Sequence, residues 1–174
     1  MTKSDIQTLP KYFDRYIHQV PDIELLEAMN QFGSGYMLAS EEQMNRLGHQ
    51  IYAPGKWTIH DIIQHIIDAE RIFAYRALRF ARMDNTKLPG FDENLFAASA
   101  SASRRSLDGL LEEFAAVRNA TICMFRSFDD EELMSTGISS NAEISVLALG
   151  FTLTGHVIHH MNVIQERYLP LISQ

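Results

Sequence analysis

Three histidines at positions 65, 156 and 160 have the residue type and the spacing that a transition-metal site needs. His156 and His160 are four residues apart, so on a helix their side chains lie one turn apart on the same face. His65 lies far upstream, in an isoleucine-rich stretch that also has the pattern of a helix. Two imidazoles from one helix and one from another can hold a metal and leave a coordination position open. An open position is typical of a reactive site and not of a purely structural one.

Helical phase decides which histidines face inward. At about 100° per residue, His160 falls within the apolar face of the last helix, and His156 lies on the flank of that face. His159 points further out, among polar residues. His65 lies at the edge of the apolar face of its own helix, where it looks toward the seam with a neighbouring helix. The phase therefore selects His65, His156 and His160 as candidate ligands.

A metal-free interpretation competes with this one, in which the three histidines are ordinary buried polar groups of an interaction module. Burying a pair of imidazoles without a partner is costly, which favours the metal. The distances decide: ring nitrogens more than about 5 Å from a common centre, against Zn–N bonds of about 2.0–2.1 Å, would favour the metal-free interpretation. His18, His49 and His60 lie near the ends of predicted elements, and we do not expect them at the site.

Glu70 and Arg167 are the charged residues whose positions also suggest chemistry. Glu70 falls in the middle of the apolar face of its helix, but five residues after His65 it is turned well away from that ligand. Because an inward carboxylate must be paired, we expect Glu70 to bond an arginine or a helix end; poising a water or a substrate is the alternative. Arg167 shares the face of the histidine pair. We expect it to pair with Glu70 or Asp68, with binding of an anionic substrate group as the alternative.

Several other side chains receive structural expectations. Asp61 and Asp68 lie near the side of His65, where a carboxylate can accept the second ring proton of a ligand, although solvated surface charge is the expected role. Trp57 is expected to be a hydrophobic staple at the start of its helix. Cys123 lies opposite the apolar face of its helix, which indicates a boundary or interface residue.

The elements that must position these residues are helices, and strand signals are scarce. Thr58 with Asp61, and the similar runs that begin at Ser40 and Ser140, have the form of capping boxes that open helices. The apolar periodicity and these caps predict helices over residues 11–19, 22–38, 40–48, 58–83, 103–128 and 140–169.

Residues 84–98, which contain Pro89 and Gly90, form the longest irregular connection, and its Phe91, Asp92 and Phe96 could cover the site. Four long amphipathic helices with short additional ones are typical of an all-α four-helix bundle. The sequence contains no internal repeat and no segment with the composition of an interdomain linker, so we expect a single domain over residues 1–174.

Composition excludes several classes of function. The 174 residues are 46% apolar and 21% charged with a net charge of −7, and they contain no dense lysine and arginine stripe, so nucleic acid and membranes are poor partners. The amino terminus lacks a signal-peptide pattern, no run approaches the roughly 20 apolar residues of a membrane span, and a single cysteine suits a reducing interior. We therefore expect a cytoplasmic protein. Phosphate-binding loops, serine-hydrolase elbows and Cys-x-x-Cys motifs are absent from the sequence.

Three segments, residues 52–76, 88–93 and 155–168, resemble the DinB-like superfamily in order and spacing. The resemblance covers most of the chain. It implies an antiparallel four-helix bundle, often a homodimer, with a three-histidine site for a divalent metal, usually zinc or nickel. By position, the ligands of the family fall on His65, His156 and His160. The resemblance also implies that characterised branches include S-transferases and isomerases that use a thiol cofactor.

Two functions remain open at this point. The first is a metal-dependent enzyme of the thiol S-transferase, isomerase or hydrolase type, which acts on a small molecule and has a low-molecular-weight thiol as a candidate second cofactor. The metal would lower the pKa of a water or thiol in the open coordination position. The second is a non-catalytic helical bundle that binds a metal or a ligand, with a stress response as a candidate context. The sequence identifies no catalytic residue beyond the candidate ligands.

Overall fold

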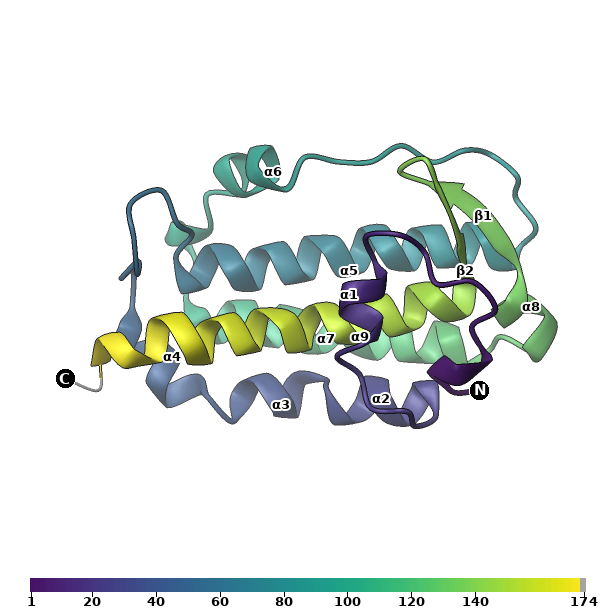
Figure 1. The fold of residues 1–174 in the computed structure, drawn as a ribbon. Helices are drawn as coiled ribbons and strands as arrows, with labels where there is room; N and C mark the ends of the chain where they lie inside the picture. Colours follow the sequence, from purple (N-terminus) through teal and green to yellow (C-terminus); the bar gives the residue numbers. More distant parts are fainter. Residues whose placement is uncertain (173–174) are drawn as a thin grey trace.

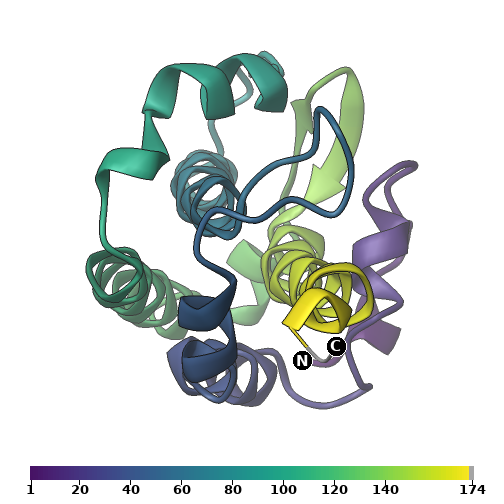
Figure 2. The ribbon, with the colours of Figure 1, turned by 90° about the vertical axis from the view of Figure 1, so that its left-hand side faces the viewer.

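Four long helical segments lie side by side in the computed structural model, which describes residues 1–172 (Figure 1). Seen along their axes, they occupy the four corners of a bundle (Figure 2). This confirms the predicted four-helix bundle. One corner is a row of three short helices, and the others are single long helices: α2 (Leu25–Gln31), α3 (Ser34–Leu38) and α4 (Glu41–Leu47) in the row, then α5 (Ile59–Ala81), α7 (Leu107–Arg126) and α9 (Val146–Val163).

The directions of the helices depend on one long connection. Helix α5 packs against both α7 and α9, and it runs antiparallel to α9. Helices α5 and α7 run in the same direction, because residues 82–106 return along the outside of the bundle before α7 begins (Figure 1). Such crossover connections are a known variation of four-helix bundles. The three candidate histidines lie on α5 and α9, whose antiparallel packing brings their side chains to a shared seam.

Short elements cover the sides and ends of the bundle. Helix α1 packs against α9, and α6 lies over α5. Within the described residues 1–172, no helix is both long and apolar enough to cross a membrane. The remaining short elements are α1 (Asp14–Ile17), α6 (Glu93–Ala100), α8 (Asp130–Met134), the single turns η1 (Lys3–Asp5), η2 (Ala102–Arg104) and η4 (Leu169–Ile172), and the π-helical turn η3 (Ile164–Tyr168).

A β-hairpin stands where the last helix was predicted to begin. Strand β1 (Thr136–Ser139) pairs antiparallel with β2 (Ala142–Ser145), and Ser140 and Asn141 form the two-residue turn with φ values of 51° and 65°. Both residues are left-handed, as the tight hairpin turn requires. The capping box predicted at Ser140 is therefore wrong. Helix α9 begins five residues later, where the Ser145 hydroxyl accepts a backbone hydrogen bond from its first turn.

Other predicted boundaries hold in part. The capping box of Thr58 and Asp61 is confirmed, since each side chain accepts a hydrogen bond from the backbone N–H of the other. Ser40 precedes α4 as predicted, but its side chain makes no capping hydrogen bond. The helix predicted over residues 22–38 is divided at Gly33, where an added Cβ would come within 3.0 Å of a backbone oxygen.

Two predicted segments differ more strongly from the structure. Of the helix predicted over residues 11–19, only the four residues of α1 are α-helical. Helix α6 covers residues 93–100, most of which were predicted to belong to an irregular connection. Its start is capped by the Asp92 carboxylate, which accepts hydrogen bonds from two backbone N–H groups. Helix α6 buries none of its side chains. A helix without an apolar face leaves little periodicity to detect in the sequence.

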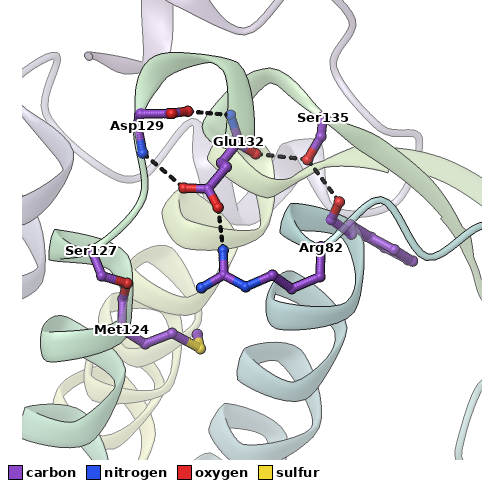
Figure 3. A network of polar contacts seen from close by, with 7 residues as sticks. Arg82, Met124, Ser127, Asp129, Glu132 and Ser135 are labelled. Atoms are coloured by element: carbon purple, nitrogen blue, oxygen red, sulfur yellow. Dashed lines mark hydrogen bonds and ion pairs between the residues drawn. The ribbon is translucent and has the colours of Figure 1, made fainter.

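Polar contacts join helix α8 to the end of α5 at one end of the bundle (Figure 3). Asp129 and Glu132 form a reciprocal capping box at its start, and Arg82 from the end of α5 pairs with Glu132. The Ser135 hydroxyl donates to the backbone oxygen of Phe80, also near the end of α5. These contacts hold the carboxyl ends of α5 and α7 together, immediately before the hairpin that leads into α9.

The core consists of two apolar clusters at the two ends of the bundle. One includes residues of α1, α2, α8 and the hairpin, and the other includes residues of α3, α4 and the chain after α9. Helix α9 contributes to both: Ile158 belongs to the first cluster and Val157 to the second. The histidine pair of α9 therefore lies where the two clusters meet.

Candidate metal centre

The three predicted histidines come together between α5 and α9. The Nε2 atom of His156 lies 3.0 Å from Nε2 of His65 and 3.1 Å from Nε2 of His160. One ring nitrogen from each residue lies within 4.8 Å of the others. This is well inside the separation that would have favoured ordinary buried histidines. The antiparallel seam places His65 opposite the pair, as its position at the edge of the helix face predicts.

The donor set fits a divalent transition metal. Three nitrogen ligands with bonds of about 2.0–2.1 Å in a tetrahedral arrangement lie roughly 3.3 Å from one another, close to the two separations seen here. Imidazole is a ligand that zinc, nickel and copper accept. Hydrogen bonding alone accounts poorly for the cluster, because a neutral imidazole has one N–H donor and two neighbours approach the same nitrogen of His156.

Burial keeps the three imidazoles neutral. Loss of hydration lowers the pKa of His156 and of His160 well below the ordinary value, and the neighbouring histidines lower both further. Burial likewise lowers the pKa of His65 to about 4, against a smaller opposing effect of Glu93. The nitrogen lone pairs are therefore available for a metal at neutral pH without competition from protons.

The burial of His156 and His160 differs from what their helical phase predicts. His156 is buried and His160 is partly exposed, whereas the phase put His160 within the apolar face and His156 on its flank. The reason is α1, which packs against α9 and brings the Tyr16 ring to 5.2 Å from the ring of His156. A second layer outside the bundle thus covers the flank.

Aromatic side chains surround the cluster. The Trp57 ring lies 4.9 Å from the ring of His65, and the Phe73 ring lies 6.2 Å from the ring of His156. Trp57 was expected only as a staple at the start of α5, but its ring packs against a candidate ligand. Its backbone oxygen accepts a hydrogen bond from the Tyr168 hydroxyl, which fixes the chain at this point.

A pocket of about 590 Å³ opens onto the cluster. Its walls come from the segment around α1, from α5, and from the connections on either side of the site. The lining residues are Lys11, Tyr12, Phe13, Arg15, Tyr16, Trp57, Arg76, Gly90, Phe91, Glu93, Ser140 and Ala142, together with His65, His156, His159 and His160. A pocket of this size suits a small molecule.

The connection predicted as a cover forms one wall of this pocket. Phe91 lines it, and the Phe96 ring packs 5.1 Å from that of Phe91. Asp92 is occupied as the cap of α6, so its carboxylate serves the helix and not the pocket. The next residue, Glu93, is the one carboxylate among the described residues that line the pocket. The sequence named Asp92 as part of a possible cover and did not single out Glu93, because the capping role of Asp92 depends on where α6 begins.

Glu70 has the expected structural role, but its partner was not foreseen. Its two carboxylate oxygens accept hydrogen bonds of 2.7 Å from Nε and Nη2 of Arg118 on α7, and both side chains are buried. Arg167 is exposed and makes no ion pair with Glu70 or Asp68, so that prediction is wrong. Helical phase cannot foresee that α7 supplies the arginine. Asp68 instead accepts a hydrogen bond from Gln64.

The remaining predicted residues lie outside the cluster. Asp61 is engaged by the Thr58 cap, and Cys123 is exposed, as expected for a boundary residue. His60 is buried against the ring of His49, at 4.6 Å between centroids. His159 lines the pocket but is not one of the three clustered histidines, in agreement with its helical phase.

Comparisons with known proteins were made for the sequence and for the structure. The family described as the DinB superfamily matches residues 16–164. The solved structure of YfiT from Bacillus subtilis, described as a probable metal-dependent hydrolase with an unusual four-helix bundle topology, is similar with a TM-score of 0.64 and 15% sequence identity. The similarity covers 91% of this chain and 87% of that one, and at this identity it shows a shared fold. No curated protein matches the sequence.

Proposed function

The chain belongs to the DinB superfamily, and from that premise we propose that it is a metal-dependent hydrolase of small molecules. His65, His156 and His160 hold one divalent ion, zinc or nickel. The observation that carries the proposal is the convergence of three imidazole nitrogens in the lining of a pocket large enough for a substrate. The resemblance to YfiT, which is described as a probable metal-dependent hydrolase, supports the reaction class.

A bound metal and the residues around it would have different roles at such a site. A divalent ion bound there supplies Lewis-acid activation of a water molecule or a substrate group. The imidazoles do not have to release a proton before they bind the ion, because burial favours their neutral form. Tyr16 and Trp57 restrict access of bulk water to the cluster. One coordination position would remain for a ligand from the pocket, since the described part of the chain brings three donors together here.

Glu93 is the general base in this proposal. Its carboxylate lines the same pocket as the histidines and is near enough to affect the pKa of His65. A carboxylate in this position accepts the proton that a water molecule releases when it attacks the substrate. Placement at the first residue of α6 fixes its backbone, because the Asp92 cap holds that turn.

Metal binding is the first test. Protein stripped with a chelator and titrated with zinc or nickel should take up one equivalent, and His65→Ala, His156→Ala and His160→Ala should each lower the affinity at least a hundredfold. His18→Ala, which removes an exposed histidine outside the pocket, is the matched control. Uptake below a tenth of an equivalent by the unmodified protein would refute the proposal.

Turnover is the second test and separates an enzyme from a metal-binding bundle. Zinc-loaded protein should hydrolyse activated esters or amides, and Glu93→Gln should lower kcat roughly a hundredfold, the usual contribution of a general base, while zinc uptake stays unchanged. Uptake of zinc without hydrolysis of any ester or amide would instead favour the non-catalytic bundle. Consumption of an added low-molecular-weight thiol would identify the thiol-transfer alternative.

A further inference from the structure

Arg76 is a second polar group of the pocket that neither the fold nor the histidine cluster explains. It follows His65 by eleven residues on α5, which is about three helical turns, so the two side chains leave the same face of the helix. Its side chain lines the pocket although the residue is only 3% exposed. A cation so deeply buried normally has an anionic partner.

Within residues 1–172, no carboxylate oxygen lies within ion-pair distance of Arg76. Its guanidinium donates one hydrogen bond of 2.7 Å, from Nη2 to the backbone oxygen of Pro89. The rings of Phe73 and Phe91 lie 5.4 and 5.9 Å from its central carbon. These contacts hold the guanidinium in place and leave donors on Nε and Nη1 for another group.

Arg118 shows what a purely structural buried arginine looks like in the same protein. It is 1% exposed, and its guanidinium makes two hydrogen bonds to the Glu70 carboxylate and two to backbone oxygens. Arg76 is nearly as buried and has none of the carboxylate contacts. The difference indicates that the anion for Arg76 comes from outside the protein.

The charge of the pocket points the same way. Among the described residues, Lys11, Arg15 and Arg76 line it together with a single carboxylate, Glu93. The whole chain carries a net charge of −7, so a cationic pocket is a local arrangement and not a reflection of composition. Such an arrangement attracts anionic ligands to a site on a protein that otherwise repels them.

The lining of the pocket indicates what kind of ligand it suits. The Phe73 ring lies 6.2 Å from the ring of His156 and 5.4 Å from the guanidinium carbon of Arg76, so one buried ring lies close to both the cation and the cluster. Phe13, Trp57 and Phe91 add apolar surface to the pocket. A matching ligand has an anionic group at one end, an apolar middle, and its reacting group at the other end.

We propose that Arg76 binds the carboxylate of the substrate and thereby directs the reacting bond toward the three histidines. The planar fork of a guanidinium matches the two oxygens of a carboxylate better than any other anion-binding side chain does. The substrate class is therefore a small carboxylic acid with an apolar or aromatic body. This inference rests on the proposed function for the reaction, but the binding of the carboxylate can be measured without a metal.

Calorimetric titration with phenylacetate and with its neutral analogue phenylacetamide tests the proposal. In chelator-treated protein and in zinc-loaded protein, phenylacetate should bind at least tenfold more tightly than phenylacetamide. Arg76→Met should abolish this preference in both forms, and Arg76→Lys, which keeps the charge but loses the fork, should retain part of it. Arg167→Met removes an exposed arginine outside the pocket and should change nothing.

The outcomes separate this proposal from the metal proposal. Equal affinities for acid and amide, or an unchanged preference in Arg76→Met, would overturn the role of Arg76. Binding of phenylacetate that disappears with the chelator and survives Arg76→Met would assign the carboxylate to the metal instead. Failure of zinc uptake would overturn the metal site and leave the chelator-treated comparison intact. If Arg76→Met does not fold, Arg76→Lys decides: an undiminished preference for the acid overturns the role of the fork.

Discussion

At the scale of single residues, the histidine cluster makes the stability of the metal-free protein sensitive to acid. Three imidazoles lie against one another and have lost much of their hydration, and protonation of any of them would create a charge beside its neighbours. Without a metal, the native state therefore holds these residues in their neutral form, while the unfolded chain binds protons at the ordinary pKa near 6.5. The difference makes stability depend on pH.

We expect the chelator-treated protein to lose stability as the pH falls. Because the pKa of His65 is lowered to about 4, the contribution of this residue is complete above pH 6.5 and declines between pH 6.5 and 4. The loss from His65 is on the order of 2–3 kcal/mol. Urea unfolding at pH 7.5, 6.0, 5.0 and 4.5 measures it, and His65→Asn should make the dependence shallower, because of the three clustered histidines only His156 and His160 then contribute to it. His18→Asn is the control; a flat curve for the unmodified protein would contradict the expectation.

Residue spacing predicted the cluster but not its surroundings. The i, i+4 pair and the seam position of His65 are local properties of helices, so the sequence was sufficient to select all three. Arg76 and Glu93 are different, because their importance depends on which groups approach them from elsewhere in the chain. An arginine without a carboxylate partner is visible only when every neighbour is in place.

At the scale of elements, the contact of α1 with α9 shapes the site. Gly155 permits this contact, because a Cβ at that position would lie 1.9 Å from the backbone oxygen of Tyr16. The same contact brings the Tyr16 ring against His156. One missing side chain thus sets the distance between a surface helix and a candidate ligand.

Gly155→Ala should push α1 away from α9 and destabilise the protein by about 2–3 kcal/mol, in the range of other overpacking substitutions. Gly35→Ala is the matched control: it lies in α3 with open space around it, and it should be neutral or stabilising by up to about 1 kcal/mol. Urea unfolding of both variants measures the difference. Equal stabilities would show that the close contact carries no energetic weight.

The long helices and the short helix α4 could be predicted from the sequence, whereas α6, α8 and the hairpin could not. Helices α5 and α7 have apolar periodicity over many turns, together with a cap at Thr58 in the case of α5. The hairpin before α9 has only four residues in each strand, and its turn begins with a run that resembles a capping box. Backbone pairing with Leu88 of the distant connection also stabilises it, and local patterns do not report that contact.

At the scale of the whole molecule, one buried ion pair joins three parts of the bundle. Glu70 comes from α5 and Arg118 from α7, and Nη1 of Arg118 also donates to the backbone oxygens of Met29 and Phe32 at the end of α2. Orphan carbonyls at a helix end need such donors. The pair therefore ties the corner of short helices to the two parallel helices.

Breaking this pair from one side should be severe. Glu70→Gln leaves the Arg118 cation buried without a carboxylate, which we expect to cost about 3–5 kcal/mol. The double variant Glu70→Gln, Arg118→Met removes the stranded charge, so its loss should be smaller than the sum of the two single losses. A double-mutant cycle by urea unfolding measures the coupling, and strictly additive losses would contradict it.

The walls of the pocket have a consequence for how proteins of this kind diverge. The histidines stand on the two long helices that the core holds in place, whereas Lys11, Phe91 and Ser140 come from connections outside the bundle. Substitutions in connections cost little folding free energy. After gene duplication, a copy can therefore acquire a pocket of different shape through changes in these segments alone, while the helices that carry the three histidines are inherited intact.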